Sequence, residues 1–144
     1  MNKLTLIDRA FFLKRTPLFS MLDLDLVLAI ADKLQVVSFD AGQPIFGISE
    51  DAHRLYLIVK GTIEIRDKSG EVLAILGADD FFGDESLFSE KPRGYEAIAK
   101  TDAIVLALSK TNLLTIISEC PSVAVGLLQA YTSMTPFRPR KLFN

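Results

Sequence analysis

A glycine, a carboxylate and an arginine stand at a spacing that suits a phosphate ester, within residues 75–98. Gly83 lets the backbone turn tightly before DESLF, a segment typical of one or two helical turns. The unpaired N–H groups at a helix start and the helix dipole both stabilise an anion. Arg93, nine positions after Asp84, follows a proline that ends this helix. Its planar guanidinium can hold a phosphate through charge-assisted bonds of about 1.5 to 3 kcal/mol.

Asp84 adds an acceptor to this predicted phosphate site. An ionised carboxylate only accepts hydrogen bonds, so beside a phosphate it repels unless it faces a donor such as a sugar hydroxyl. A cation for the phosphate and an acceptor for a ribose hydroxyl together indicate a nucleotide.

The segment FFGDESLFSEKPRGYEAIAKT resembles the phosphate-binding cassette of the cyclic nucleotide-binding domain family, without a gap from Phe82 to Thr101. LYLIVKGTIEI resembles the family's barrel hairpin with its glycine at Gly61, and TPLFSMLDLDLVLAIADKL resembles its helical lead-in. The combination is more specific than a lone glycine motif. The resemblance implies a non-catalytic regulatory module that senses cAMP or cGMP, signals through hinge and lid helices, and needs no cofactor.

The resemblance also assigns roles to residues of the cassette. Gly83 would let the backbone approach the sugar-phosphate, Asp84 would accept the ribose 2′-hydroxyl, and Arg93 would hold the phosphate. Small residues at two further positions would give N–H groups to that phosphate. The ligand site expected from the resemblance comprises Phe82, Gly83, Asp84, Glu85, Ser86, Leu87, Pro92, Arg93, Gly94 and Tyr95.

Simpler roles remain open for the same residues: Asp84 as a helix N-cap and Arg93 in a surface ion pair. The chain also departs from the family pattern, because Gly94, Tyr95 and Glu96 follow the arginine and Glu85 replaces an apolar residue. Tyr95 either stacks on a base or fills the pocket, and the acids add negative charge near the ligand. The alternative hypothesis is therefore a degenerate barrel that no longer binds nucleotide and serves as a protein-interaction or assembly domain.

Composition narrows the class of protein. The 144 residues predict one domain, and 49% hydrophobic residues suffice for a core. A net charge of −2 gives no broad basic field for nucleic acid or an anionic membrane. His53 is the only histidine and Cys120 the only cysteine, which disfavours a metal centre, a catalytic site and a disulfide framework, and is compatible with a reducing cytoplasm.

Periodicity predicts a mainly β fold with flanking helices: an antiparallel β-barrel or jelly roll (double-stranded β-helix). Within a single domain spanning residues 1–144, we expect a helical lead-in at 1–34, the barrel at 35–109 with the cassette at 82–95, hinge and lid helices at 110–135, and a flexible tail at 136–144. The barrel prediction rests on runs such as TIEIRD, with Ile63 and Ile65 inward.

Helical spacing supports the flanking elements. The apolar positions that define them are Leu4, Ile7, Ala10 and Phe11; Leu26, Ile30 and Leu34; Leu113, Ile116 and Ile117; and Val125, Leu128 and Tyr131. The apolar segment 111–137 is interrupted by Glu119 and Pro121, so we expect buried or interfacial helices and no membrane insertion.

The sequence says less about partners. Only 13 residues follow Tyr131, too few for a helix-turn-helix, so we expect no nucleic-acid partner for these residues. The effector would be an unknown protein or a fused domain. Apolar faces on the terminal helices are compatible with a homodimer.

Overall fold

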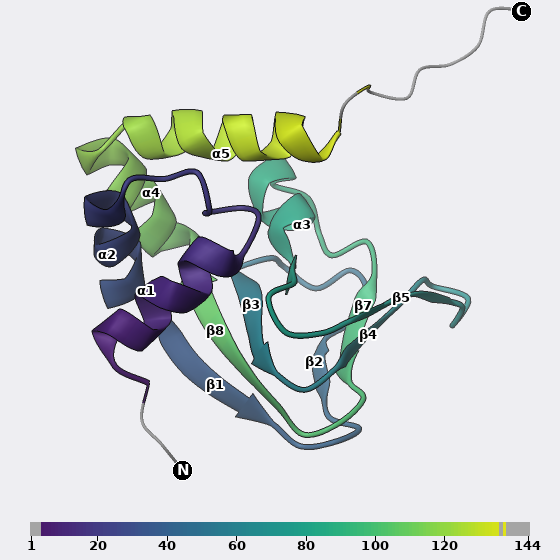
Figure 1. Cartoon of the computed structure of the whole chain (residues 1–144). Coiled ribbons are helices and arrows are strands. Elements are labelled where there is room, and N and C mark those ends of the chain that lie inside the picture. The colour runs from purple at the N-terminus through teal and green to yellow at the C-terminus, as the bar shows by residue number, and fades with distance from the viewer. Residues whose placement is uncertain (1–3, 136, 138–144) are drawn as a thin grey trace, which may run out of the picture.

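The computed structural model describes residues 4–135 and 137, and it consists of two facing β-sheets with helices on one side (Figure 1). The helices and strands are α1 (Leu6–Arg15), α2 (Leu24–Asp32), β1 (Gln35–Phe39), β2 (Pro44–Phe46), β3 (Arg54–Lys60), β4 (Ile63–Arg66), β5 (Val72–Leu76), β6 (Phe81–Phe82), α3 (Asp84–Ser89), β7 (Glu96–Ala99), β8 (Ala103–Ser109), α4 (Lys110–Glu119) and α5 (Ser122–Met134).

The strands form two four-stranded sheets, in the orders β1-β8-β3-β6 and β2-β7-β4-β5. Within each sheet, every pair of neighbouring strands is antiparallel, which confirms the prediction of a mainly β, jelly-roll-like fold with flanking helices. Closure into a barrel is not observed, because no ladder joins the two sheets among the described residues. The edge strands β2 and β6 are three and two residues long, too short to link one sheet to the other.

Two hydrophobic clusters share the central strand β3. One lies between the sheets, where Ile63 and Ile65 point inward as predicted and meet the aromatic rings of Phe46 and Phe82. The other lies between the first sheet and the helices. Because both faces of β3 are covered, its residues Leu55 to Ile58 are buried without alternation.

The helices bury only some of the residues that their apolar spacing indicates. In α1, Ala10 and Leu13 are buried, whereas Ile7 and Phe11 are each 63% exposed and line an apolar groove between α1 and α2. In α2, Ile30 is buried as expected. In α1 the core covers the stripe through Ala10 and Leu13, and Ile7 and Phe11 lie outside that stripe.

Helix α5 departs from the prediction in the same way. Val125 and Leu128 are 55% and 65% exposed, while its buried face is built from Val123, Gly126, Leu127 and Ala130. Leu113 and Ile116 of α4 are buried as expected. A helix that is apolar on both faces does not reveal from spacing alone which face the core covers.

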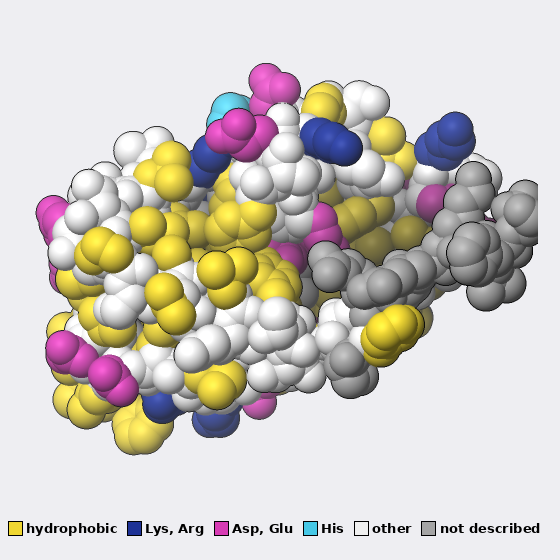
Figure 2. Space-filling view, turned by 90° about the horizontal axis from the view of Figure 1, so that it is seen from above, with side chains coloured by type: hydrophobic (Ala, Val, Ile, Leu, Met, Phe, Trp, Pro, Cys, Tyr) yellow, Lys and Arg dark blue, Asp and Glu magenta, His cyan; other side chains and the backbone are white. Residues whose placement is uncertain are grey.

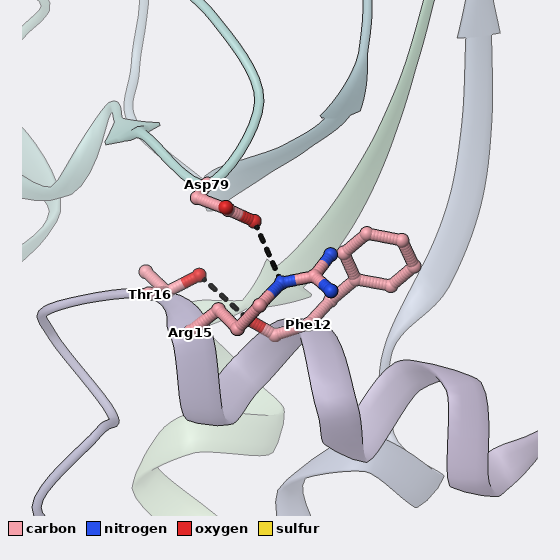
Figure 3. Close-up of polar contacts among 4 residues, drawn as sticks. All are labelled: Phe12, Arg15, Thr16 and Asp79. Carbon is pink, nitrogen blue, oxygen red and sulfur yellow. Dashed lines mark hydrogen bonds and ion pairs between the residues drawn. The ribbon is translucent and has the colours of Figure 1, made fainter.

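The end of α1 is tied to the turn that precedes the cassette (Figure 3). Arg15 Nε donates to Asp79 Oδ1 at 3.2 Å, and its guanidinium carbon lies 4.6 Å from the centroid of the Phe12 ring. Thr16 Oγ1 donates to the Phe12 carbonyl at 2.9 Å, and the helix ends at Thr16, whose backbone is extended before Pro17. The lead-in therefore fixes the position of the chain just before β6.

No single helix among residues 4–135 and 137 is both long and apolar enough to cross a membrane. The pair α4 and α5, which bend by 115° at their break, reaches that length and composition only when both are counted together. The expected flexible tail, 136–144, lies outside the described residues except for Phe137. The division into one domain remains a prediction.

A substitution at Gly61 tests how closely the β3–β4 turn approaches β8. Its φ is +95°, and a Cβ there would collide with the Asp102 carbonyl and lie 2.8 Å from Ala103 Cα. Gly70 has a similar φ of +87° but open space around it. We expect Gly61→Ala to lower the free energy of unfolding by about 2 to 4 kcal/mol and the control Gly70→Ala by about 1 kcal/mol. Urea unfolding measures both; equal losses would contradict the clash.

Candidate ligand-binding site

The cassette begins where β6 turns into α3 at Gly83. This residue has φ +82°, in the left-handed region, and its N–H and carbonyl both face the interior of the site. A Cβ at Gly83 would lie 3.0 Å from Arg93 Nη1 and 3.2 Å from Tyr56 Cδ2. Glycine is therefore required twice, for the backbone conformation and for the approach of the arginine.

Arg93 is 4% exposed and its side chain points inward. Nη1 donates to the Gly83 carbonyl at 2.5 Å and Nη2 to the Arg54 carbonyl at 2.6 Å, while the guanidinium carbon lies 4.0 Å from the Phe46 ring centroid. Nε is buried without a hydrogen-bond partner. Burial lowers the pKa of Arg93 from its usual value. The guanidinium is thus a buried cation held by carbonyl dipoles and a ring face.

The surface ion pair considered for Arg93 does not occur in the part of the chain that the structure describes, where no carboxylate lies within ion-pair distance of it. The backbone around it is also fixed. Arg93 N donates to the Glu50 carbonyl at 2.8 Å, and the Arg93 carbonyl accepts from Ser49 N at 2.8 Å. The residue is therefore held rigidly at both main chain and side chain.

Tyr95 directs its hydroxyl into the same site. The hydroxyl accepts from the Gly83 N–H at 2.8 Å and donates to Glu85 Oε1 at 2.6 Å. The ring lies 5.6 Å from that of Phe46, and burial together with the bond to Glu85 raises the pKa of Tyr95. The phenol thus occupies the N–H of Gly83, as expected if Tyr95 fills the site; its stacking on a base remains a prediction.

Asp84 is 4% exposed, and Tyr131 of α5 donates its hydroxyl to Asp84 Oδ2 at 2.7 Å. Burial, and secondly the negative charge of Glu85, raise the pKa of Asp84 to about 6. The N-cap interpretation of Asp84 is wrong, because Gly83 is the N-cap and no side chain caps α3. The carboxylate is instead a buried acceptor that connects the cassette to α5.

The remaining predicted residues divide into three groups. Phe82 and Leu87 are buried in the two hydrophobic clusters, where they support the cassette from beneath. Ser86 Oγ donates to the Pro92 carbonyl at 3.2 Å and closes the loop after α3. Gly94 is exposed. Direct ligand contact by any of these residues remains a prediction.

The expectation that Glu96 adds charge beside a ligand is wrong. In β7, Ala97 and Ala99 point into the core, so Glu96 lies on the outer face, where it pairs in register with Arg66 of β4. Glu85 does face the site, and although it is exposed, its charge contributes to the raised pKa of Asp84.

Several participants escaped sequence reasoning. Phe46 and the Arg54 carbonyl come from strands distant in sequence, and a main-chain carbonyl has no side-chain signature. Tyr131 was visible only as an apolar position of a helix. A tyrosine on an otherwise apolar helix face was the one available signal of such a role, since a buried phenol hydroxyl needs a hydrogen-bond partner.

Comparison with known proteins gives a consistent family match. The model of the "Cyclic nucleotide-binding domain" matches residues 36–120. The cyclic AMP receptor protein of Thermus thermophilus is 34% identical over 122 residues, covering 80% of this chain and 55% of the relative. A CRP-like cAMP-activated global transcriptional regulator of Mycobacterium tuberculosis is 28% identical over 121 residues, covering 81% and 54%. The chain thus spans about half the length of these relatives.

Solved structures of similar proteins share the fold of this chain. The N-terminal domain of a transcriptional regulator from Streptomyces coelicolor has a TM-score of 0.78 and 28% identity, covering 87% of this chain and 92% of that domain. The catabolite activator protein of Thermus thermophilus has a TM-score of 0.72 and 32% identity, covering 84% and 59%.

The raised pKa of Asp84 predicts a pH dependence of stability. The folded protein holds this proton up to a pH of about 6, whereas the unfolded chain releases it near 3.8, so ionisation of Asp84 costs stability as the pH rises between these values. Relative to Asp84→Asn, whose amide oxygen still accepts from Tyr131, the wild-type free energy of unfolding should fall by on the order of 2 to 3 kcal/mol between about pH 4 and pH 7. Urea unfolding across this range tests it; a constant difference between the two proteins would refute the shift.

Proposed function

Because the chain belongs to the cyclic nucleotide-binding domain family, we propose that it is a non-catalytic regulatory module that binds cAMP or cGMP at the cassette. The observation that carries the proposal is the buried guanidinium of Arg93. It has two carbonyl partners, an unpaired Nε and no carboxylate in ion-pair distance among the described residues. A buried cation in this state is stabilised by an incoming anion.

The cyclic phosphate is an anion suited to this position. Carbonyl oxygens carry partial charges, so they satisfy the hydrogen bonds of Arg93 without neutralising it. A phosphate oxygen facing the guanidinium would also come close to the Gly83 N–H and the start of α3, where backbone donors gather. The sugar hydroxyl would then face Asp84, the buried acceptor of the site.

Binding of the nucleotide requires an exchange of partners. The Tyr95 hydroxyl must leave the Gly83 N–H, and its bond to Glu85 must break or move. Glu85 is exposed, so it can turn toward solvent at small cost. The regulatory output follows from a population shift, in which a ligand that prefers one arrangement of the cassette changes how α4 and α5 lie against it.

A second function follows if this exchange does not take place. If the Tyr95 phenol keeps the Gly83 donor permanently, the domain is a degenerate member that serves as a protein-interaction or assembly domain. Its supporting observation is the pair of bonds at 2.8 and 2.6 Å that Tyr95 makes to Gly83 and Glu85. These bonds satisfy the Gly83 N–H and the Tyr95 hydroxyl without any ligand.

The proposed partners are a cyclic nucleotide and an effector protein or fused domain. Val125 and Leu128 of α5 are exposed, and Figure 2 shows hydrophobic side chains gathered on the face seen from above, so we include a homodimer in the proposal. Two of the relatives are named as transcriptional regulators, and the chain spans about half of their length. The absence of a nucleic-acid partner and location in the cytoplasm therefore stay predictions.

Calorimetric titration with cAMP and cGMP tests the proposal. We expect affinity in the micromolar range, roughly, for at least one nucleotide, and a loss of at least about tenfold in Arg93→Ala because the charge-assisted bonds disappear. Arg9→Ala is the matched control, since Arg9 of α1 also donates to two main-chain carbonyls, those of Ala31 and Leu34, away from the cassette. Its affinity should stay within about twofold of the wild type. Binding that Arg93→Ala leaves unchanged would rule out the phosphate role.

Tyr95→Phe separates the two functions. The variant keeps the ring against Phe46 and removes only the hydroxyl that engages Gly83 and Glu85. A nucleotide sensor should bind about three- to tenfold more tightly after this change, because the ligand no longer displaces that hydroxyl. Absence of calorimetric heat with both nucleotides, in the wild type and in the variant, favours the degenerate domain.

A further inference from the structure

Helix α5 reaches the candidate site through one side chain, Tyr131. We propose that Tyr131 is a specificity-determining residue of the site, because its hydroxyl engages the carboxylate that the sugar 2′-hydroxyl would use, so that nucleotide and α5 compete for Asp84. This inference rests on the proposed function, which assigns Asp84 to the sugar. It gives α5 a defined chemical link to the ligand.

Tyr131 covers one oxygen of the Asp84 carboxylate. Its hydroxyl donates to Asp84 Oδ2 at 2.7 Å, and its ring meets that of Phe88 edge-on, with centroids 5.9 Å apart and planes at 87°. Asp84 as a whole residue is 4% exposed in this arrangement, so a sugar reaches its carboxylate only when a side chain that covers it moves. Tyr131 is the side chain bonded to that carboxylate, so we take its movement as the step that admits a 2′-hydroxyl.

The two ends of α5 are held very differently. Figure 1 shows α5 crossing from α4 at its start to α3 at its end. The first part is packed firmly, because Leu127 and Ala130 are buried and a Cβ at Gly126 would collide with Leu22. Beyond Tyr131 the residues 132–135 are exposed. Tyr131 is thus the last residue of α5 that is partly buried, and it connects the end of the helix to the cassette. Beyond it, Ser133 Oγ makes an exposed contact with Met21 Sδ at 4.0 Å.

Loss of the bond to Asp84 would accordingly free the last turn of α5. A sugar that takes Asp84 replaces a hydrogen bond within the chain by one to the ligand, so the 2′-hydroxyl contributes only the difference between the two. The direction is opposite to closure of a lid. Nucleotide binding should loosen the end of α5, and a nucleotide without the 2′-hydroxyl should leave it attached.

The test compares cAMP with 2′-deoxy-cAMP by calorimetry, in the wild type and in Tyr131→Phe. Phenylalanine keeps the ring contact with Phe88 and removes the competing hydroxyl. We expect affinity for cAMP to rise about tenfold and affinity for 2′-deoxy-cAMP to stay unchanged, so the preference for the ribose form rises about tenfold. Titration at a pH of about 8 keeps Asp84 ionised.

Thr132→Val is the matched control, because it removes a hydroxyl of α5 that bonds only to the carbonyls of Leu128 and Gln129 within the helix. Its preference between the two nucleotides should equal that of the wild type. A merely structural role of Tyr131 would change both affinities by the same factor, and that result would overturn this inference while leaving the proposed function intact. Binding of neither nucleotide by any of the three proteins would overturn the proposed function and this inference together.

Hydrogen exchange provides a second readout, which can be measured both in the free protein and with nucleotide. The backbone amides of residues 131–134 should exchange faster in Tyr131→Phe than in the wild type, and cAMP should accelerate them in the wild type while 2′-deoxy-cAMP should not. Unchanged exchange in Tyr131→Phe would contradict the attachment of α5 through Asp84, whatever the nucleotide affinities are.

Discussion

The burial of one guanidinium organises the candidate site. Arg93 reaches from the loop after α3 to the carbonyls of Gly83 and Arg54, and it therefore joins the cassette to the start of the central strand β3. Glycine is favoured at position 83 by its φ of +82° and by the 3.0 Å that would separate a Cβ from Arg93 Nη1, and Phe46 presents its ring face to the charge. Burying a cation without an anion is costly, so the surrounding dipoles stabilise the folded chain and also leave it ready for an anionic ligand.

The polar groups around Arg93 are satisfied within the chain. Tyr95 bridges the Gly83 N–H and Glu85, and Tyr131 donates to Asp84. Ligand affinity is therefore a difference between bonds lost and bonds gained, which makes it sensitive to a single hydroxyl. These internal bonds also give a role to Glu85, which departs from the usual pattern of the family cassette, because it accepts from Tyr95. The same sensitivity also explains why two functions, sensor and degenerate domain, differ by the strength of a few internal hydrogen bonds.

The sequence predicted the elements more reliably than their orientation. The alternation in TIEIRD correctly placed Ile63 and Ile65 inward, and the cassette predicted a glycine turn followed by a short helix. The prediction from sequence failed where packing against elements distant in sequence decides which face of a helix is buried. Ile7 of α1 and Leu128 of α5, for example, are exposed. Periodicity defines stripes on a helix, but packing decides which stripe the core covers. For the site, residue types indicated Arg93 and Asp84, whereas the carbonyl and phenol partners depend on tertiary contacts that no local pattern encodes.

The central claim is that the buried guanidinium of Arg93 binds the phosphate of a cyclic nucleotide while the Tyr95 hydroxyl gives up the Gly83 N–H. A crystal structure with cAMP at saturating concentration tests this most directly. The account predicts a phosphate oxygen within hydrogen-bond distance of Arg93, with the Tyr95 hydroxyl displaced from the Gly83 N–H. Arg93 without a phosphate beside it, and the phenol still on Gly83 with nucleotide in excess, would contradict it.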